Sequence, residues 1–307
     1  MLSFSTRWNS HRHTDGEQMM SEIRLLGFDT IEMGHGLKLS LVPGIKRLLQ
    51  RGRVTVSSLQ NFCPAPVEEL GSDPNSVEFT SRKRNDVKRA LQLTYQTIDY
   101  AKEFNAPFVV LRLGSTPLHG FTEGMMKLAE NGQFNSRGFV HNKIRAVEMR
   151  EKHTGRTMEK VKDALDHIVT YAGRKGIKIG IKSRRNFEQA PTERELLELM
   201  EDFKGNPYVG YWHDFGHIQC KANLGLIDHE QWLKKMQPYI LGCHVHDVHW
   251  PGTDHCVPMS GTIEFEKLMP LIPPEAPMVW TLDPSQKTAD IKRAMAGWEE
   301  RIGIKDL

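Results

Sequence analysis

Short runs rich in β-branched and other apolar residues alternate with longer amphipathic stretches along the whole chain, and this pair recurs eight times. The apolar runs lie near residues 2, 29, 54, 107, 177, 208, 240 and 277. Strict alternation of strands and helices predicts a parallel sheet covered by helices, and eight units are the number that closes a barrel. Because no low-complexity linker divides the chain, we expect residues 1–307 to form one domain, a single (β/α)8 TIM barrel of the α/β class.

Two connections are longer than the roughly 2 to 6 residues that usually join a strand to the next helix. They follow the third and fourth predicted strands and span residues 63–80 and 115–155. Both follow the carboxyl ends of strands, where barrels of this kind carry their functional sites, so we expect them to act as a lid and a pocket wall. The segment GFTEGMMKLAENGQF has helical periodicity, which favours an ordered cover.

Composition narrows the classes of partner. Lys and Arg number 41 against 38 Asp and Glu, a net charge of +3, so we expect no nucleic-acid partner. The N-terminus, MLSFSTRWNSHRHTDGEQ, contains no apolar signal-peptide region, and no apolar run approaches the ~20 residues of a membrane span. We therefore expect no membrane partner and a cytoplasmic location.

The spacing of the four cysteines predicts reduced thiols, because no CxxC pair occurs among Cys63, Cys220, Cys243 and Cys256. A nucleophilic Cys256 beside His255 is the alternative.

Polar residues capable of catalysis or metal binding cluster where two neighbouring strands are predicted to end. The sixth strand ends in YWHDFGH, which contains Asp214 and His217, and the seventh ends in HVHD, which begins with His244. Only the carboxyl ends of barrel strands direct side chains from several strands at one ligand, so we expect these three to lie close together. A carboxylate and two imidazoles are ligands for a divalent metal and are also acid/base groups.

These runs, together with DHCVPMSGTIEF, resemble the signature of the xylose isomerase-like, or sugar phosphate isomerase/epimerase, superfamily, which also contains the apurinic endonucleases. The segments GFDTIEMGHG, VSSLQNFCPAP and IDYAKEFNAPFVVLRLGS extend the resemblance over nearly the whole chain. The resemblance implies a TIM barrel in which one divalent ion is held by a Glu on strand five, an Asp on strand six, a His on strand seven and a Glu on strand eight. Asp214 and His244 match this pattern. Family membership specifies the fold better than the reaction.

The chain departs from the family pattern at four positions around this site. Lys182 and Thr281 stand where the two glutamates are expected, and Gln60 and Arg112 stand where relatives often have histidine. Two anionic ligands are lost and two cations are added, and their repulsion of a metal ion costs several kcal/mol. We therefore expect no cofactor, only the remnant ligands Asp214, His244 and His217. One weakly bound divalent ion (Mn, Zn or Mg) is the alternative.

Lys182 allows three interpretations. Paired with Asp214, it would replace the charge of the metal ion by an internal salt bridge. Together with Arg112 and Arg184, it would form an anion pocket for a carboxylate or phosphate. With a lowered pKa, it would instead react with a carbonyl group.

Two sets of site residues follow from these positions. The predicted catalytic set consists of Lys182, Asp214, His217, His244 and His255, because imidazoles transfer protons near neutral pH without a metal. The predicted substrate-binding set consists of Gln60, Arg112, Arg184 and Asp283, together with Trp8 and Glu32, which the resemblance places where relatives contact their substrates. Trp8 is alternatively a core residue, and Asp283 is alternatively a turn residue before Pro284.

Together these features predict a sugar isomerase- or epimerase-like enzyme. His and Lys would move a proton next to the carbonyl of a small, carbohydrate-like, anionic substrate. The alternative is a non-catalytic relative that binds a ligand or a partner, and a lyase or dehydratase is less favoured. An apurinic endonuclease is also less favoured, because the four departures remove ligands that its metal cluster needs. The pattern leaves the oligomeric state open.

Overall fold

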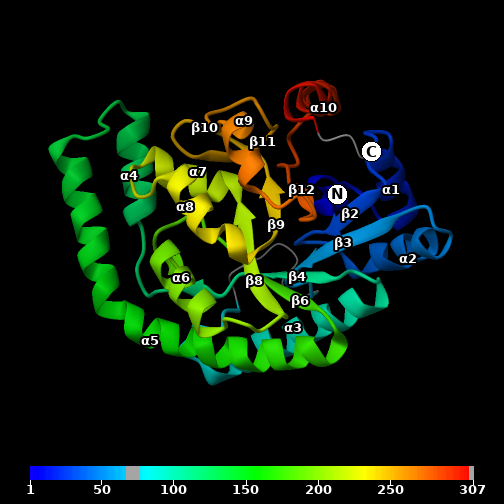
Figure 1. Ribbon diagram of the computed structural model, residues 1–307, viewed down its shortest axis with the longest axis horizontal. Helices are drawn as coiled ribbons and strands as arrows, with labels where there is room; N and C mark the ends of the chain where they lie inside the picture. Colours follow the sequence, from blue (N-terminus) through cyan, green and yellow to red (C-terminus); the bar gives the residue numbers. More distant parts are fainter. Residues whose placement is uncertain (67–76, 304–307) are drawn as a thin grey trace.

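Eight parallel strands form a closed barrel in the described part of the chain, residues 1–66 and 77–303 of this computed structural model (Figure 1). Around the barrel the strands follow the order β1, β12, β9, β8, β6, β4, β3, β2. Their bounds are β1 Leu2–Ser5, β2 Thr30–Met33, β3 Thr55–Gln60, β4 Phe108–Leu111, β6 Lys178–Lys182, β8 Val209–Asp214, β9 Ile240–Val245 and β12 Met278–Trp280. The TIM barrel predicted from the alternating pattern is confirmed.

Helices follow the strands and cover the outside of the barrel (Figure 1). Helix α3 illustrates why: its buried positions include Leu93, Thr97 and Ala101, which share one side of the helix. The bounds are α1 Gly16–Arg24, α2 Val42–Gln50, α3 Arg84–Glu103, α4 Phe121–Glu130, α5 Arg137–Lys175, α6 Glu193–Asp202, α7 Phe215–Asn223, α8 His229–Met236, α9 Phe265–Leu268 and α10 Thr288–Ile302. None of the helices in the described ranges is long and apolar enough to cross a membrane.

Two short antiparallel sheets extend the carboxyl ends of the barrel strands. One pairs β5 (Gly114–Ser115) with β7 (Gln189–Ala190), and the other pairs β10 (Asp247–His249) with β11 (Thr253–Cys256). Asp247 holds the second sheet against the following loop, because its carboxylate accepts hydrogen bonds from three backbone N–H groups, those of Val248, Gly261 and Ile263. The hairpin that carries His255 on β11 is therefore anchored at the mouth of the barrel.

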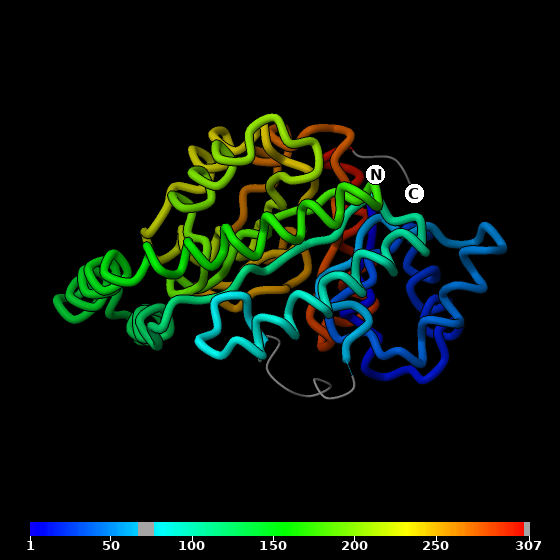
Figure 2. The backbone as a smooth tube through the Cα atoms, turned by 90° about the horizontal axis from the view of Figure 1, so that it is seen from below, coloured from blue at the N-terminus to red at the C-terminus, as the bar shows by residue number. Residues whose placement is uncertain are grey.

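The long connection after β4 is mostly helical. The helix predicted within residues 120–134 is confirmed as α4, whereas the loop expected to continue to residue 155 ends at Arg137, where α5 begins. Helix α5 has 39 residues; the Ser136 side chain caps its start, and Gly176, at φ 74°, ends it. Figure 2 shows α5 along the outside of the barrel, with α4 and the first turns of α5 projecting beyond it. Within the other predicted loop, residues 67–76 lie outside the described part of the chain.

A tryptophan fills the barrel below the predicted site. Trp212 is fully buried and packs against Val110 and Val279 from other strands. Gly180 and Gly242 make room for it, because a Cβ atom at either position would lie 2.8 or 2.5 Å from the indole. Since side chains alternate across a strand, the residues two positions beyond this layer point inward at the next level.

Candidate active site

Asp214 lies at the centre of a buried ionic cluster. It ends β8 and is also the N-cap of α7, where its Oδ1 accepts the backbone N–H of His217 at 2.8 Å. The Nζ of Lys182 lies 2.8 Å from Oδ2, and Nε2 of His246 lies 2.9 Å from Oδ1. Asp214 and His246 are fully buried, and Lys182 is 2% exposed. Of the three interpretations of Lys182, the structure shows the internal salt bridge.

His244 joins this cluster to the opposite wall of the barrel. Its Nε2 lies 2.7 Å from Oε2 of Glu32 on β2, and its Nδ1 lies 3.4 Å from Oδ2 of Asp214. Glu32 also accepts hydrogen bonds from the hydroxyls of Ser5 and Ser58. Both Glu32 and His244 are fully buried, so two carboxylates, the imidazoles of His244 and His246 and an ammonium group form one network inside the barrel.

The network shifts the protonation equilibria of its members. Burial alone would raise the pKa of Asp214, but His217, Lys182 and His246 together hold it well below its ordinary value. The pKa of Glu32 is also lowered, because His244 and Lys182 outweigh the effect of burial. Burial lowers the pKa of Lys182 despite the opposing charge of Asp214. Both carboxylates are therefore ionised at neutral pH.

His217 and His255 lie near the mouth, with one nitrogen of each ring free of hydrogen bonds to the described residues. Nδ1 of His217 donates to the carbonyl oxygen of Ser183 at 3.0 Å, and Nδ1 of His255 donates to that of Thr281 at 2.8 Å. Each contact leaves a lone pair on Nε2, and the ring centroids are 6.0 Å apart. Burial is the largest cause that lowers the pKa of both histidines well below the ordinary value, so both rings are neutral near pH 7.

The donors at the family's metal position do not fit a divalent ion. Both oxygens of Asp214 are already engaged by Lys182, His246 and His217, and His244 lies 3.4 Å from one of them. Lys182 places an ammonium group beside Asp214, and the carbonyl of Thr281 accepts a hydrogen bond from His255. A cation at this position would compete with Lys182 for the same oxygen.

A second group of residues nearer the mouth has the donors of a metal site. Nitrogen atoms of His217, His246 and His255 lie within 4.8 Å of one another. His246 is the least available of the three, because its Nδ1 accepts the backbone N–H of His255 while Nε2 donates to Asp214. The Nε2 atoms of His217 and His255, held by backbone carbonyls, are oriented as metal-bound histidines usually are, and zinc is the ion that suits imidazole ligands.

A cavity of about 400 Å³ opens at the mouth beside these histidines. Its described lining includes the carboxylates of Glu123, Glu130, Asp254 and Asp283, but of basic residues only Arg185. Arg185 is paired with Glu123 at 2.9 Å and with Asp254 at 3.6 Å. The carboxylate of Asp254 also lies 3.7 Å from Nε2 of His217. The cavity is thus polar and rich in carboxylates, and one of these carboxylates, that of Asp254, connects it to the imidazole of His217.

Two of the predicted substrate-binding residues meet through a histidine that the sequence did not single out. Nη2 of Arg112 donates to Nδ1 of His35 at 3.3 Å, and Oε1 of Gln60 accepts the backbone N–H of the same histidine at 3.4 Å. Burial, and after it the charge of Arg112, lowers the pKa of His35 to about 3, so the ring is a neutral acceptor. Arg184 is buried in the loop after β6.

The contacts of Trp8 and Asp283 match the structural alternatives given for them. Trp8 is 1% exposed and donates its indole N–H to the carbonyl of Gln286, which corresponds to the core alternative. Asp283 accepts hydrogen bonds from the backbone N–H and hydroxyl of Ser285, the turn alternative, although it also borders the mouth cavity. The alternative of a nucleophilic Cys256 gains no support, because burial raises the pKa of its thiol.

Asp254 is a residue of the mouth to which the sequence pattern assigned no role. It directly precedes His255 in the run TDHC, and that adjacent carboxylate and imidazole were a usable signal. His246 has the same inward parity as His244, which favours a residue behind the site or at the surface. It lies just beyond the end of β9, behind Asp214, with Nε2 2.9 Å from Oδ1 of that carboxylate.

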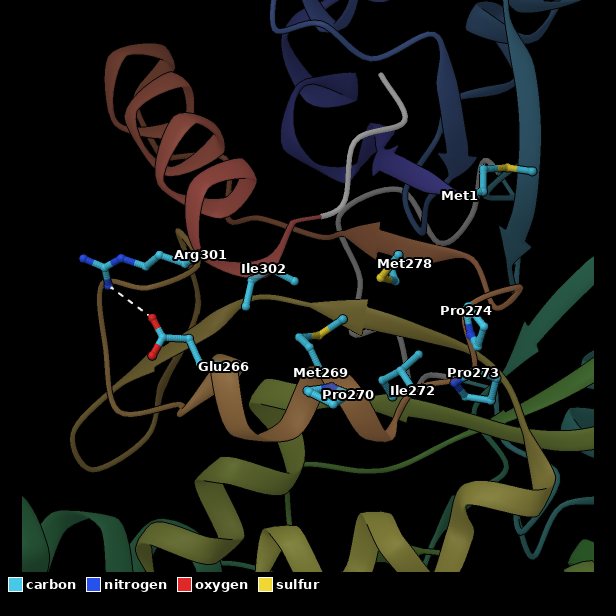
Figure 3. A pocket seen from close by; sticks show the side chains of 10 residues that line it. All are labelled: Met1, Glu266, Met269, Pro270, Ile272, Pro273, Pro274, Met278, Arg301 and Ile302. Atoms are coloured by element: carbon cyan, nitrogen blue, oxygen red, sulfur yellow. Dashed lines mark ion pairs between the residues drawn. The ribbon is translucent and has the colours of Figure 1, made fainter.

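The other end of the barrel carries a different kind of cavity (Figure 3). It has a volume of about 340 Å³ and is lined mostly by apolar side chains, among them Met1, Met269 and Met278. Met1 and Met278 lie at the amino ends of β1 and β12. The charged groups that line it, Glu266 and Arg301, are paired with each other at 3.9 Å. This cavity lacks the acid/base groups of the mouth, so the candidate active site lies at the carboxyl ends of the strands.

The fold and site define a TIM barrel whose buried charges and neutral imidazoles gather at the carboxyl ends of its strands. The family model described as xylose isomerase-like TIM barrel matches residues 20–275. The chain therefore belongs to this family, as its motifs predicted.

Solved structures of similar fold are sugar epimerases and related proteins. The D-tagatose 3-epimerase-like protein has 18% sequence identity and a TM-score of 0.70, with 98% of this chain and 97% of that chain covered. The 3-keto-D-glucoside 4-epimerase from E. coli has 12% identity and a TM-score of 0.66, with 97% and 98% covered. The IOLI protein, described with a zinc atom, has 13% identity and a TM-score of 0.67, with 99% of both chains covered. No match was found among curated proteins. At these identities the structural likeness establishes the fold.

Proposed function

We propose that this protein is a sugar isomerase- or epimerase-like enzyme that moves a proton next to a carbonyl group without a metal at the family position. The observation that carries the proposal is the pair of neutral imidazoles, His217 and His255, each oriented by a backbone carbonyl at Nδ1. A general base must be unprotonated at the working pH and must have a free lone pair, and both rings meet these conditions.

In this mechanism Nε2 of His217 removes the proton from the carbon beside the carbonyl. The imidazolium that forms is stabilised by Asp254, whose Oδ2 lies 3.7 Å away. Loss of this proton leaves an enediolate. The imidazolium can return the proton to the neighbouring carbon while the hydroxyl proton passes to the other oxygen, which gives an isomer. Alternatively, a water molecule on the side of His255 protonates the original carbon, and the hydroxide that is left takes the proton of the His217 imidazolium, which gives an epimer. Lys182 acts as a positioning residue, because its ion pair holds Asp214 as the cap of α7, the helix that carries His217.

The family and its sugar-epimerase neighbours support a small polyhydroxy carbonyl compound as substrate. We favour a neutral one. The anionic substrate expected from Arg112 and Lys182 depends on cations that already contact His35 and Asp214. The carboxylates at the mouth would accept hydrogen bonds from sugar hydroxyls and repel a phosphate.

Solvent deuterium incorporation tests the proposal, because proton transfer exchanges label even where net conversion is slow. The protein is incubated in D2O with a panel of neutral ketoses, aldoses, sugar acids and sugar phosphates, and exchange is followed by NMR. We expect exchange with neutral sugars, reduced about 10²–10⁴-fold by His217→Gln or His255→Gln. His249→Gln is the matched control, because His249 is exposed and its ring contacts the hydroxyl of Ser260 rather than a residue of the site.

Exchange that both site substitutions leave unchanged would refute the assignment of the two bases. No exchange with any compound, combined with thermal stabilisation by one of them, would favour the alternative, a non-catalytic relative that binds a ligand. The filled centre of the barrel, where Glu32, His244, Asp214 and Lys182 form ion pairs with one another, is the observation that favours this alternative.

A further inference from the structure

Exposed apolar side chains gather on the part of the molecule that projects from the barrel. In residues 1–66 and 77–303, eight large apolar side chains are 37–73% exposed, and five belong to the α4–α5 region or the hairpin that it touches: Phe134, Val140, Ile144, Val147 and Trp250. Phe134 and Trp250 contact each other, with ring centroids 5.4 Å apart. We call α4, the turn after it and residues 137–156 of α5 the arm; Figures 1 and 2 show it at one end of the molecule.

Three of these residues form a stripe along the outer face of α5. Val140, Ile144 and Val147 are spaced by four and three residues, so they lie on one side of the helix, and they are 43%, 53% and 40% exposed. The buried residues of the same segment, such as Phe139 and Ala146, lie on another side. The outward face of a helix on a barrel is ordinarily polar, so an exposed stripe of this kind marks a contact surface.

The charges at the two ends of the stripe are opposite. Arg137 precedes Val140 by three residues and Glu151 follows Val147 by four, so both continue the same side of the helix. When two such helices pack antiparallel about a two-fold axis near Ile144, Arg137 of each copy lies opposite Glu151 of the other. The stripe is therefore complementary to itself, which is the condition for an isologous interface.

A cavity beside the acidic end of the stripe fits the same arrangement. It has a volume of about 580 Å³, and its lining includes Val147, Glu151, Phe187, Leu226 and Ile227. Its four apolar lining residues stand among charged ones such as Glu193 and Arg194, so the cavity provides space for apolar and for polar side chains of a second helix. We propose that the arm is a homodimer interface in which the α5 stripes of two copies pack antiparallel. This interface does not depend on the proposed function.

Sedimentation equilibrium of the full chain tests the interface. We expect a dimer for the wild type, and Ile144→Glu should weaken dimerisation at least about 100-fold, because it places a charge at the axis. Leu25→Glu is the matched control, since Leu25 is the most exposed of the eight apolar residues, at 73%, and lies outside the arm. All substituted positions are exposed, so circular dichroism should show unchanged folding.

A charge exchange tests the antiparallel arrangement. Arg137→Glu and Glu151→Arg should each weaken dimerisation roughly tenfold, and the two together should restore it, because the pairing is re-formed with the signs reversed. Ile144→Cys should also give a disulfide-linked dimer on oxidation, whereas Leu25→Cys should not; the four native cysteines are buried. A wild-type monomer at about 100 μM protein, or a dimer that Ile144→Glu leaves intact, would overturn the proposal. Failure of the charge exchange to restore dimerisation would overturn the antiparallel arrangement.

Discussion

The ion pair between Lys182 and Asp214 offers a direct test of the buried network. In Lys182→Met the cation 2.8 Å from Asp214 is lost, while Asp214 stays fully buried with its ionised neighbour Glu32 in the same network. Removing one partner of a buried pair costs about 3–5 kcal/mol of unfolding free energy, because the remaining charge is left uncompensated. We expect a loss of this size in urea denaturation at pH 7.

The double variant Lys182→Met/Asp214→Asn should recover about 2 kcal/mol of that loss. Asn keeps an acceptor for the backbone N–H of His217 and for Nε2 of His246, but carries no charge that needs a cation. Lys162→Met is the control: its partner Asp202 lies 2.5 Å away, but both side chains are about half exposed, at 47% and 48%, so the loss should stay below about 1 kcal/mol.

The pH dependence gives the same prediction a second readout. The folded-state pKa of Asp214 is depressed, so its contribution to stability is present above the unfolded value of 3.8 and is lost as the pH falls below it. In Lys182→Met the folded pKa rises and this contribution shrinks, so the gap to the wild type should narrow in acid. A variant as stable as the wild type, or a double variant that recovers nothing, would refute the reasoning.

Three further predictions concern metals and acid stability. The double variant Lys182→Glu/Thr281→Glu restores two carboxylates beside Asp214, so it should bind manganese more tightly than Lys182→Glu alone in calorimetric titration. A folded double variant that binds no manganese would contradict our placement of β6 and β12. Zinc should bind at His217 and His255 and inhibit deuterium exchange. The double variant His217→Gln/His255→Gln should abolish zinc binding, measured with a chromophoric chelator. An unchanged number of zinc ions bound per chain would rule this site out. Burial lowers the pKa of His229 to about 3 from 6.5, so the unfolded state gains a proton first, and this group alone should lower the unfolding free energy by about 3 kcal/mol between pH 6.5 and 4. A urea-denaturation profile that is flat in this range, or that His229→Gln leaves equally steep, would contradict the last prediction.

Much of the fold and part of the site could be predicted from local patterns. Short β-branched runs between amphipathic stretches identified the barrel strands, and the ends of two of them contained Asp214 and His244, which do lie together at 3.4 Å. The resemblance to the family placed Lys182 where a metal ligand stands in relatives. The beginning of α5 at Arg137 was missed, because its first turns project from the barrel and bury too few residues to show the helical period clearly.

The tertiary structure decided which side chains meet. Glu32 and His244 are separated by 212 residues and form a contact of 2.7 Å across the barrel, which follows from how the closed sheet staggers its strands. Whether Lys182 forms a salt bridge, an anion pocket or a reactive amine depends on its distance to Asp214. The two residues belong to different strands, and no spacing along the chain determines that distance. The free nitrogen of each imidazole is likewise set by the carbonyls of Ser183 and Thr281, which are remote in sequence. A linear pattern reports which face of an element is buried, whereas protonation and pairing depend on atoms that only folding brings within hydrogen-bonding distance.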